Sequence, residues 1–208
     1  MYDFLVDLDD YFCEKYSNYD KLCVLQGYRM PVMQATKTDE FGRTVSYTLP
    51  SSTMRLALQE NKADILKSLK ERILDKGFSF SFRPIGLFRR IKNAFVKNSP
   101  KKVLTQLLDK YKTDKESAIE DLKIEKEIWR NICKGKFAPT KNTIFSLALT
   151  GHYSLQDAVL LLQVNGYAFD FDEERDVVVA YLLEKKVFAR PMIEAAFAEY
   201  KVDNLFIK

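Results

Sequence analysis

The sequence predicts a mostly helical protein in which an α+β N-terminal domain is followed by an all-α, helix-turn-helix-type C-terminal domain. Two observations support this fold class. Short apolar runs with strand spacing occur only in the first part of the chain, whereas the apolar positions after residue 102 repeat with helical spacing. Between these parts, the polar, proline-containing sequence NSPKK at 98–102 interrupts the apolar periodicity. We therefore expect domains at 1–97 and 103–208.

The expected N-terminal domain begins with an amphipathic helix and continues with short strands. Apolar side chains from Phe4 to Tyr16 recur at helical spacing, and the acidic residues lie mostly on other faces. A turn at 39–42 joins two of the strands, and Gly77 is a natural helix stop. Alternation of phenylalanine and serine over 78–82 indicates one more strand. The expected order is a helix at 1–18, strands at 22–25, 30–36 and 43–49, a helix from the start signal at 50–53 to Gly77, and a strand at 78–82.

The expected C-terminal domain is a series of helices with recognisable start and stop residues. Thr113 and Glu116 form a capping box, and Ser154 with Asp157 begins a later helix. Gly135 suits the left-handed residue that commonly ends a helix. The helices are expected at 103–112, 114–122, 125–134, 140–150, 154–164, 173–186 and 190–200.

One segment within this series has the apolar pattern of a helix-turn-helix. Ala118 and Leu122 give the first helix a core face, and Trp129 and Ile132 do the same for the second. Ile124 occupies the turn between them. Such a pair of helices is typical of a recognition module and not of a catalytic one.

These core residues, together with the K-G-K-x-x-P pattern at 134–139 and the leucine- and alanine-rich helix after it, resemble the lambda-repressor-like helix-turn-helix superfamily. The similarity covers about 60 residues. It implies that the exposed start of the second helix enters the major groove of DNA. The end of the chain, 160–188, is also similar to an extension on small bacterial modules of this kind, some of which occur in toxin–antitoxin or defence contexts.

The residues at the exposed start of this second helix carry charges of both signs. Glu125 and Glu127 would face the phosphate backbone, and cytosine amino groups would be their only good partners on the bases. Two hypotheses follow. The protein is a non-catalytic adaptor that binds another protein, such as a toxin or effector encoded nearby, or it is a sequence-specific DNA-binding transcriptional regulator that binds duplex DNA; a homodimer is expected for the regulator. The candidate recognition surface consists of Glu125, Lys126, Glu127, Arg130, Lys134 and Lys136.

The excess positive charge lies in one segment. Residues 76–108 contain eight basic side chains and no acidic one, although the net charge of the chain is only +4. A helix there would place Phe88, Ile91 and Phe95 on one face. Such a helix is interpreted as a solvated surface helix on the N-terminal domain, a phosphate-contacting arm, a peripheral membrane contact or a patch for an acidic partner. The basic arm is defined as Arg83, Arg89, Arg90, Lys92, Lys97, Lys101 and Lys102.

The sequence predicts no enzyme, and neither a cofactor nor a metal is expected. His152 is the only histidine, and the three cysteines lie far apart, so no familiar zinc set can be assembled. We interpret His152 as a loop residue that flanks a helix. The acidic pattern at 7–10 is similar to a phosphatase aspartate pair but fits a helix better. The aromatic alternation at 78–82 is interpreted as the buried face of a strand, with a base-stacking platform as the alternative.

The expected location is cytoplasmic, without membrane insertion. No run of 18 or more apolar residues occurs, and the first ten residues are acidic where a signal peptide would be basic.

Overall fold

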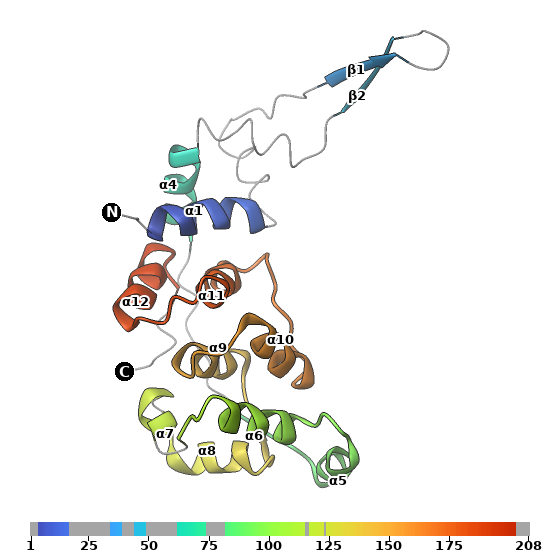
Figure 1. The fold of residues 1–208 in the computed structure, drawn as a ribbon, viewed down its shortest axis with the longest axis vertical. Helices are drawn as coiled ribbons and strands as arrows, with labels where there is room; N and C mark the ends of the chain where they lie inside the picture. Colours follow the sequence, from blue (N-terminus) through green and yellow to red (C-terminus); the bar gives the residue numbers. More distant parts are fainter. Residues whose placement is uncertain are drawn as a thin grey trace. The chain divides into compact units, whose positions relative to one another are not determined.

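The computed structural model describes residues 4–16, 34–38, 44–48, 62–73, 82–114, 117–122 and 124–202. Over these residues the chain is mostly helical, as predicted, and its strands are short (Figure 1). The chain divides into two compact units, Met1–Leu74 and Asp75–Lys208. No described helix has the length and apolar character needed to cross a membrane.

This division differs from the boundary expected at 98–102, which separated 1–97 from 103–208. The short strand β3, Arg83–Pro84, pairs antiparallel with β4, Phe137–Ala138, and therefore belongs to the C-terminal unit. The N–H of Ile85 extends this pairing by donating to the carbonyl of Lys136 over 2.7 Å. Pro100, which interrupts the periodicity in sequence, lies in the first turn of a helix, where its fixed φ is favourable.

The N-terminal unit contains two described helices and one hairpin, with bounds α1 Phe4–Lys15, β1 Gln34–Thr38, β2 Thr44–Thr48 and α4 Lys62–Arg72. Leu8 and Phe12 of α1 and Ile65 of α4 are buried, as the apolar spacing predicts. Lys70 of α4 donates to Asp9 of α1 over 2.9 Å. The acidic pattern at the start of the chain is thus part of a helix, as interpreted from its spacing.

The hairpin confirms two of the strands expected in this unit. β1 and β2 pair antiparallel, with Gln34 opposite Thr48 and Thr38 opposite Thr44. The strand expected at 22–25 and most of the one expected at 78–82 lie outside the described residues.

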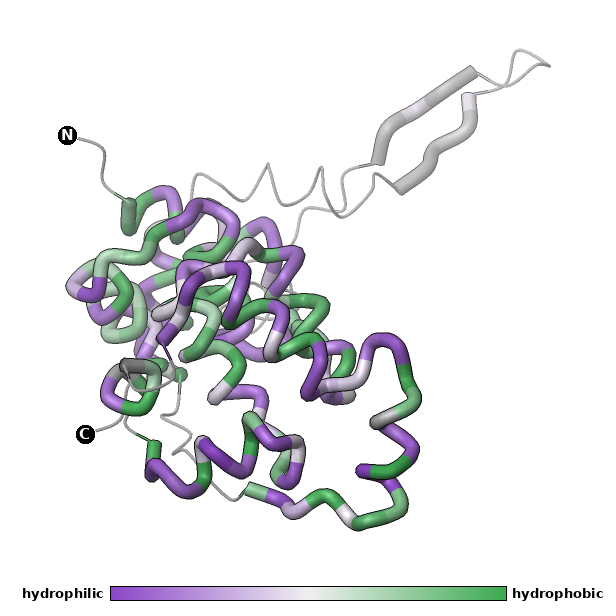
Figure 2. The backbone as a smooth tube through the Cα atoms, turned by 60° about the horizontal axis from the view of Figure 1, so that its bottom comes forward, coloured by the Kyte–Doolittle hydropathy of each residue, from purple (hydrophilic) through white to green (hydrophobic). Residues whose placement is uncertain are grey.

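The C-terminal unit is built from helices joined by short connections. Those expected after residue 102 are found within a few residues of their predicted bounds. Figure 2 shows hydrophobic and hydrophilic residues alternating along the helical tube. The helices are α5 Leu87–Phe95, α6 Pro100–Lys110, α7 Ser117–Leu122, α8 Lys126–Cys133, α9 Lys141–Thr150, α10 Leu155–Val164, α11 Glu174–Glu184 and α12 Arg190–Glu199.

The centre of this unit is formed by α9 and α11. Residues 143–149 of α9 and 176–183 of α11 are buried without interruption, which is the pattern of helices covered on all sides. In Figure 1, α9 lies among α7, α10 and α11, and it packs against all three. The start of α9 is fixed by Thr140, whose hydroxyl accepts from the N–H of Thr143. Ser154 caps α10 in the same way through the N–H of Asp157, as predicted.

Candidate functional site

The apolar faces of α7 and α8 have the burial that the sequence predicts. Trp129 and Ile132 of α8 are buried, as are Ala118 and Leu122 of α7. α8 packs against α6, and α7 packs against α9. Gly135 follows α8 with a φ of +68°, the left-handed conformation expected for the residue that ends this helix. The capping box proposed for Thr113 involves Glu116, which lies outside the described residues.

The opposite face of α8 is open to solvent. All six residues of the candidate recognition surface are exposed: Glu125, Lys126, Glu127, Arg130, Lys134 and Lys136. Glu125 is the N-cap of α8, and its side chain makes no capping hydrogen bond. The face therefore presents two carboxylates at its start and cations along the rest of its length.

Helix α5 exposes the apolar face that the sequence predicts. The side chain of Phe88 is 90% exposed and that of Phe95 is 86% exposed, and Leu87 and Ile91 are also exposed. Basic residues occupy the other side of the same helix, with Arg89 and Lys92 exposed as well. The helix is thus amphipathic, and its apolar face is exposed.

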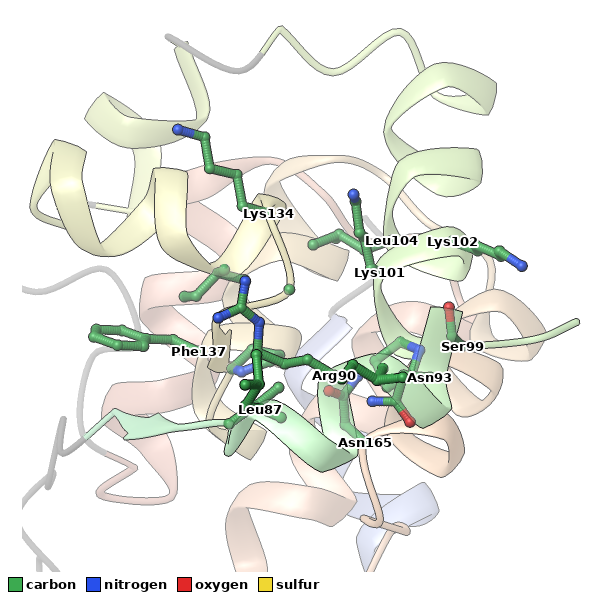
Figure 3. A pocket seen from close by; sticks show the side chains of 16 residues that line it. Leu87, Arg90, Asn93, Ser99, Lys101, Lys102, Leu104, Lys134, Phe137 and Asn165 are labelled. Atoms are coloured by element: carbon green, nitrogen blue, oxygen red, sulfur yellow. The ribbon is translucent and has the colours of Figure 1, made fainter. Parts of the chain in front are cut away.

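A pocket of about 440 Å³ lies where α5, the start of α6, the end of α8 and β4 meet (Figure 3). Its apolar lining includes Ile91, Leu104, Ile132, Phe137 and Pro139. Its basic lining consists of Arg90, Lys101, Lys102 and Lys134. No acidic side chain is among the described residues that line it.

This pocket brings together parts of both predicted residue sets. Arg90, Lys101 and Lys102 come from the basic arm, and Lys134 comes from the recognition surface. The two sets meet because α6 passes close to the end of α8: a Cβ atom added to Gly135 would lie 3.2 Å from the Cβ of Lys101. The remaining predicted residues do not line the pocket: Arg83, Arg89, Lys92 and Lys97 of the arm, and Glu125, Lys126, Glu127, Arg130 and Lys136 of the recognition surface.

Sequence reasoning did not identify the neutral polar residues of the pocket. Asn93, Ser99 and Asn165 line it, and they come from three separate segments. Ser99 lies in the segment 98–102, where the sequence predicts a domain boundary, but it is the N-cap of α6 and only 3% exposed. The one sequence feature that could have identified it is its position directly before Pro100, since proline is common in the first turn of a helix.

His152 is a surface residue at the end of α9. It has a φ of +55°, and its ring stacks on Phe188 with ring centroids 4.7 Å apart. This placement agrees with a residue that flanks a helix. Cys13 and Cys133 are partly buried, and the described ranges contain no cluster of three or more His, Cys, Asp or Glu side chains that could hold a metal ion.

A second polar cluster joins the end of α6 to the start of α10. The carboxylate of Asp157 accepts hydrogen bonds from Tyr111, Lys110 and Ser154 over 2.5, 2.7 and 2.8 Å. Burial alone would raise the pKa of Asp157, but these hydrogen bonds outweigh it and hold the pKa below its usual value. The cluster therefore fixes one end of α6 while the other end borders the pocket.

Comparison with known proteins gives no relative: no protein-family model, no curated protein and no solved structure matches this chain.

Proposed function

We propose that the C-terminal unit is a non-catalytic protein-interaction module that binds a partner through α5 and the exposed face of α8. The observation that supports this function best is the exposure of Phe88 and Phe95. Together with Ile91 they are spaced as i, i+3 and i+7, which is how an amphipathic helix inserts its anchors into the groove of a partner. Exposed apolar side chains that gather on one helix face, as Leu87, Phe88, Ile91 and Phe95 do, commonly mark a site of protein interaction.

The charges around these anchors indicate the complementary surface. Arg89 and Lys92 of α5 are exposed cations, so the proposed groove has an acidic rim. Glu125 and Glu127 of α8 present carboxylates, and basic side chains of the partner would pair with them. A toxin or effector encoded nearby is the kind of partner that the bacterial resemblance implies.

Duplex DNA is the second candidate, and a specific observation favours it. Arg130, Lys134 and Lys136 are exposed at and beyond the second half of α8. Lys134 lies at the same pocket as two cations of the basic arm, Arg90 and Lys101. Cations that converge from two elements are the usual footprint of phosphate contacts. The two carboxylates at the start of α8 oppose this function, because that end of the helix would approach the bases.

The first test separates the two candidates by their dependence on charge. We would measure the fluorescence anisotropy of labelled random duplex DNA with the full chain at low and moderate salt. The protein-interaction proposal expects weak binding that the double change Glu125→Gln and Glu127→Gln strengthens. Tight wild-type binding that falls steeply with salt, and that Arg130→Ala weakens, would instead support the DNA candidate.

The second test asks whether α5 contacts a partner protein. A photo-crosslinking residue is placed at position 88 in the full chain expressed in its own cells, and a matched one at position 184, which is exposed on α11. We expect a discrete crosslinked protein from position 88 only, and its loss when Phe95→Ser is added. Equal crosslinking from both positions, or persistence with Phe95→Ser, would contradict the proposal.

A further inference from the structure

The charged side chains that line the pocket between α5, α6 and α8 are all basic. Arg90, Lys101 and Lys134 line it from three different elements, as Figure 3 shows. In the part of the chain that the structure describes, none of these three has an ion-pair partner. The whole chain has 33 basic and 29 acidic residues, so a lining with cations and no carboxylate is a local bias and not a consequence of composition. An anion in this pocket would be attracted from several directions.

The start of α6 adds uncharged donors to the same place. Pro100 has no N–H, so the backbone donors without an acceptor inside the helix are the N–H groups of Lys101 and Lys102, and the N-terminal end of the helix dipole is positive. Ser99 occupies the N-cap position and lines the pocket, but its side chain makes no capping hydrogen bond although it is only 3% exposed. A serine that lines the pocket at an uncapped helix start is suited to bind an anionic oxygen.

The apolar lining of the pocket favours a ligand that is larger than a simple ion. Leu104 and Ile132 are buried in the core of the unit, and Ile91 and Phe137 form apolar walls beside them. A volume of about 440 Å³ lies within the usual range for sites that hold small organic molecules. An inorganic anion would leave this apolar surface in contact with water, whereas an apolar body would cover it.

We propose that this pocket binds a small amphiphilic anion, in which a carboxylate or phosphate group is attached to an apolar body. The anionic group lies between Lys101, Lys134 and the start of α6, and the apolar body lies against Leu104 and Ile132. Ile91 and Lys134 belong both to this pocket and to the surface of the proposed protein contact, whereas Phe88 and Phe95 do not line the pocket. Changes at Phe88 or Phe95 therefore test the protein contact alone, and a change at Lys101 of α6 tests the pocket alone.

The test is isothermal titration calorimetry of the full chain with decanoate, with decyl phosphate and inorganic phosphate as further arms. Decanol and decyltrimethylammonium serve as uncharged and cationic controls. We expect saturable binding of decanoate or decyl phosphate, and the tighter of the two identifies the anionic group. Inorganic phosphate, decanol and the cationic amphiphile should each bind at least about tenfold more weakly.

Matched variants place the binding in the pocket. Lys101→Gln with Lys134→Gln should weaken binding by at least about tenfold. Lys92→Gln with Lys97→Gln removes the same charge from exposed positions outside the pocket and should leave the affinity within about twofold. Among apolar residues, Ile91→Ser should weaken binding and Phe88→Ser should not, and both positions are exposed enough to tolerate serine.

Three results would overturn the proposal. The first is an absence of saturable binding by both anionic amphiphiles. The second is equal binding of inorganic phosphate, which would mean a simple ion site without use of the apolar floor. The third is equal loss of affinity in the pocket variants and their matched controls, which would mean general attraction to a basic surface. Circular dichroism of each variant confirms that a loss of binding is not a loss of fold.

Discussion

The hydroxyl of Tyr111 donates a hydrogen bond of 2.5 Å to the carboxylate of Asp157, and it accepts one of 2.9 Å from the N–H of Ser154. A single side chain at the end of α6 thus contacts both the capping residue and the first turn of α10. Helix α6 is held at this end by hydrogen bonds, while its other end supplies Ser99 and Lys101 to the pocket.

Replacement of Tyr111 by phenylalanine should destabilise the C-terminal unit by about 1 to 3 kcal/mol, because a hydrogen bond to a carboxylate is lost while the ring remains. Lys110→Gln should cost less than Tyr111→Phe, since the Lys110 side chain is 58% exposed and its ion pair is screened by water. Urea unfolding followed by the emission of Trp129, the only tryptophan, measures both. Equal costs would contradict the importance of the hydroxyl.

The stability contributed by Asp157 should depend on pH in the acidic range. Its folded-state pKa is lowered, so the contribution is fully present above the unfolded aspartate pKa of about 4. It is lost as pH falls through the folded-state pKa. The difference in unfolding free energy between wild type and Asp157→Asn should therefore shrink as pH falls below that range. A difference that stays constant with pH would show that the ionised form makes no special contribution.

Lys141→Gln should destabilise the protein by about 2 to 3 kcal/mol, because it leaves the buried carboxylate of Asp176 without its cation. The cost is below that of a fully buried pair, since Lys141 retains some contact with solvent. Burial already raises the pKa of Asp176, with the hydrogen bonds from Lys141 and from the N–H of Asp170 opposing it. The variant raises that pKa further, so its cost should grow as pH rises through the raised folded-state pKa of wild type and should level off above that of the variant.

The measurement is urea unfolding of wild type and Lys141→Gln at several pH values. Arg190→Gln is the control, because it breaks an exposed i, i+4 ion pair with Glu194 and should cost about 0.5 kcal/mol or less. A cost for Lys141→Gln as small as that of the control would mean that Asp176 does not need this cation.

Gly135→Ala and Gly166→Ala should differ in cost although both glycines have positive φ. At Gly166 a new Cβ would meet nothing within 4 Å, so only the backbone conformation is strained, at about 1 kcal/mol. At Gly135 the Cβ would also press on the Cβ of Lys101 at 3.2 Å, which raises the cost and disturbs the pocket. Thermal unfolding compares the two, and decanoate titration should show weaker binding for Gly135→Ala alone. Equal costs and equal affinities would contradict the close approach of α6 and α8.

The helices of the C-terminal unit could be predicted because the signals that identify them, apolar spacing and capping residues, lie within the local sequence. The apolar stripe of α8 places Trp129 in the core and Arg130 on the surface, and the cap at Ser154 marks the start of α10 within the local sequence. The exposure of the whole recognition surface follows from the same period.

The boundary and the pocket could not be predicted, because both depend on contacts between distant segments. β3 and β4 have two residues each, which is too short for an alternation of apolar and polar residues to be recognised. The hydrogen bond from the N–H of Ile85 to the carbonyl of Lys136 joins segments that are far apart in the sequence. In a sequence, a proline such as Pro100 is compatible with either a helix break or a helix start. Tertiary packing determines which of the two occurs. Asn165 reaches the pocket from a helix end that is unremarkable in sequence.

The pairing of β3 with β4 has a consequence for anyone who divides this protein into pieces. A shortened chain that starts at residue 103 would keep α6 to α12 almost whole, yet it would lack Arg90, Ser99 and Lys101. The backbone of Phe137 would also lose the strand that covers its edge. A piece that contains the intact pocket and the β3–β4 pair must begin no later than Arg83, so the basic arm is part of the folded C-terminal unit.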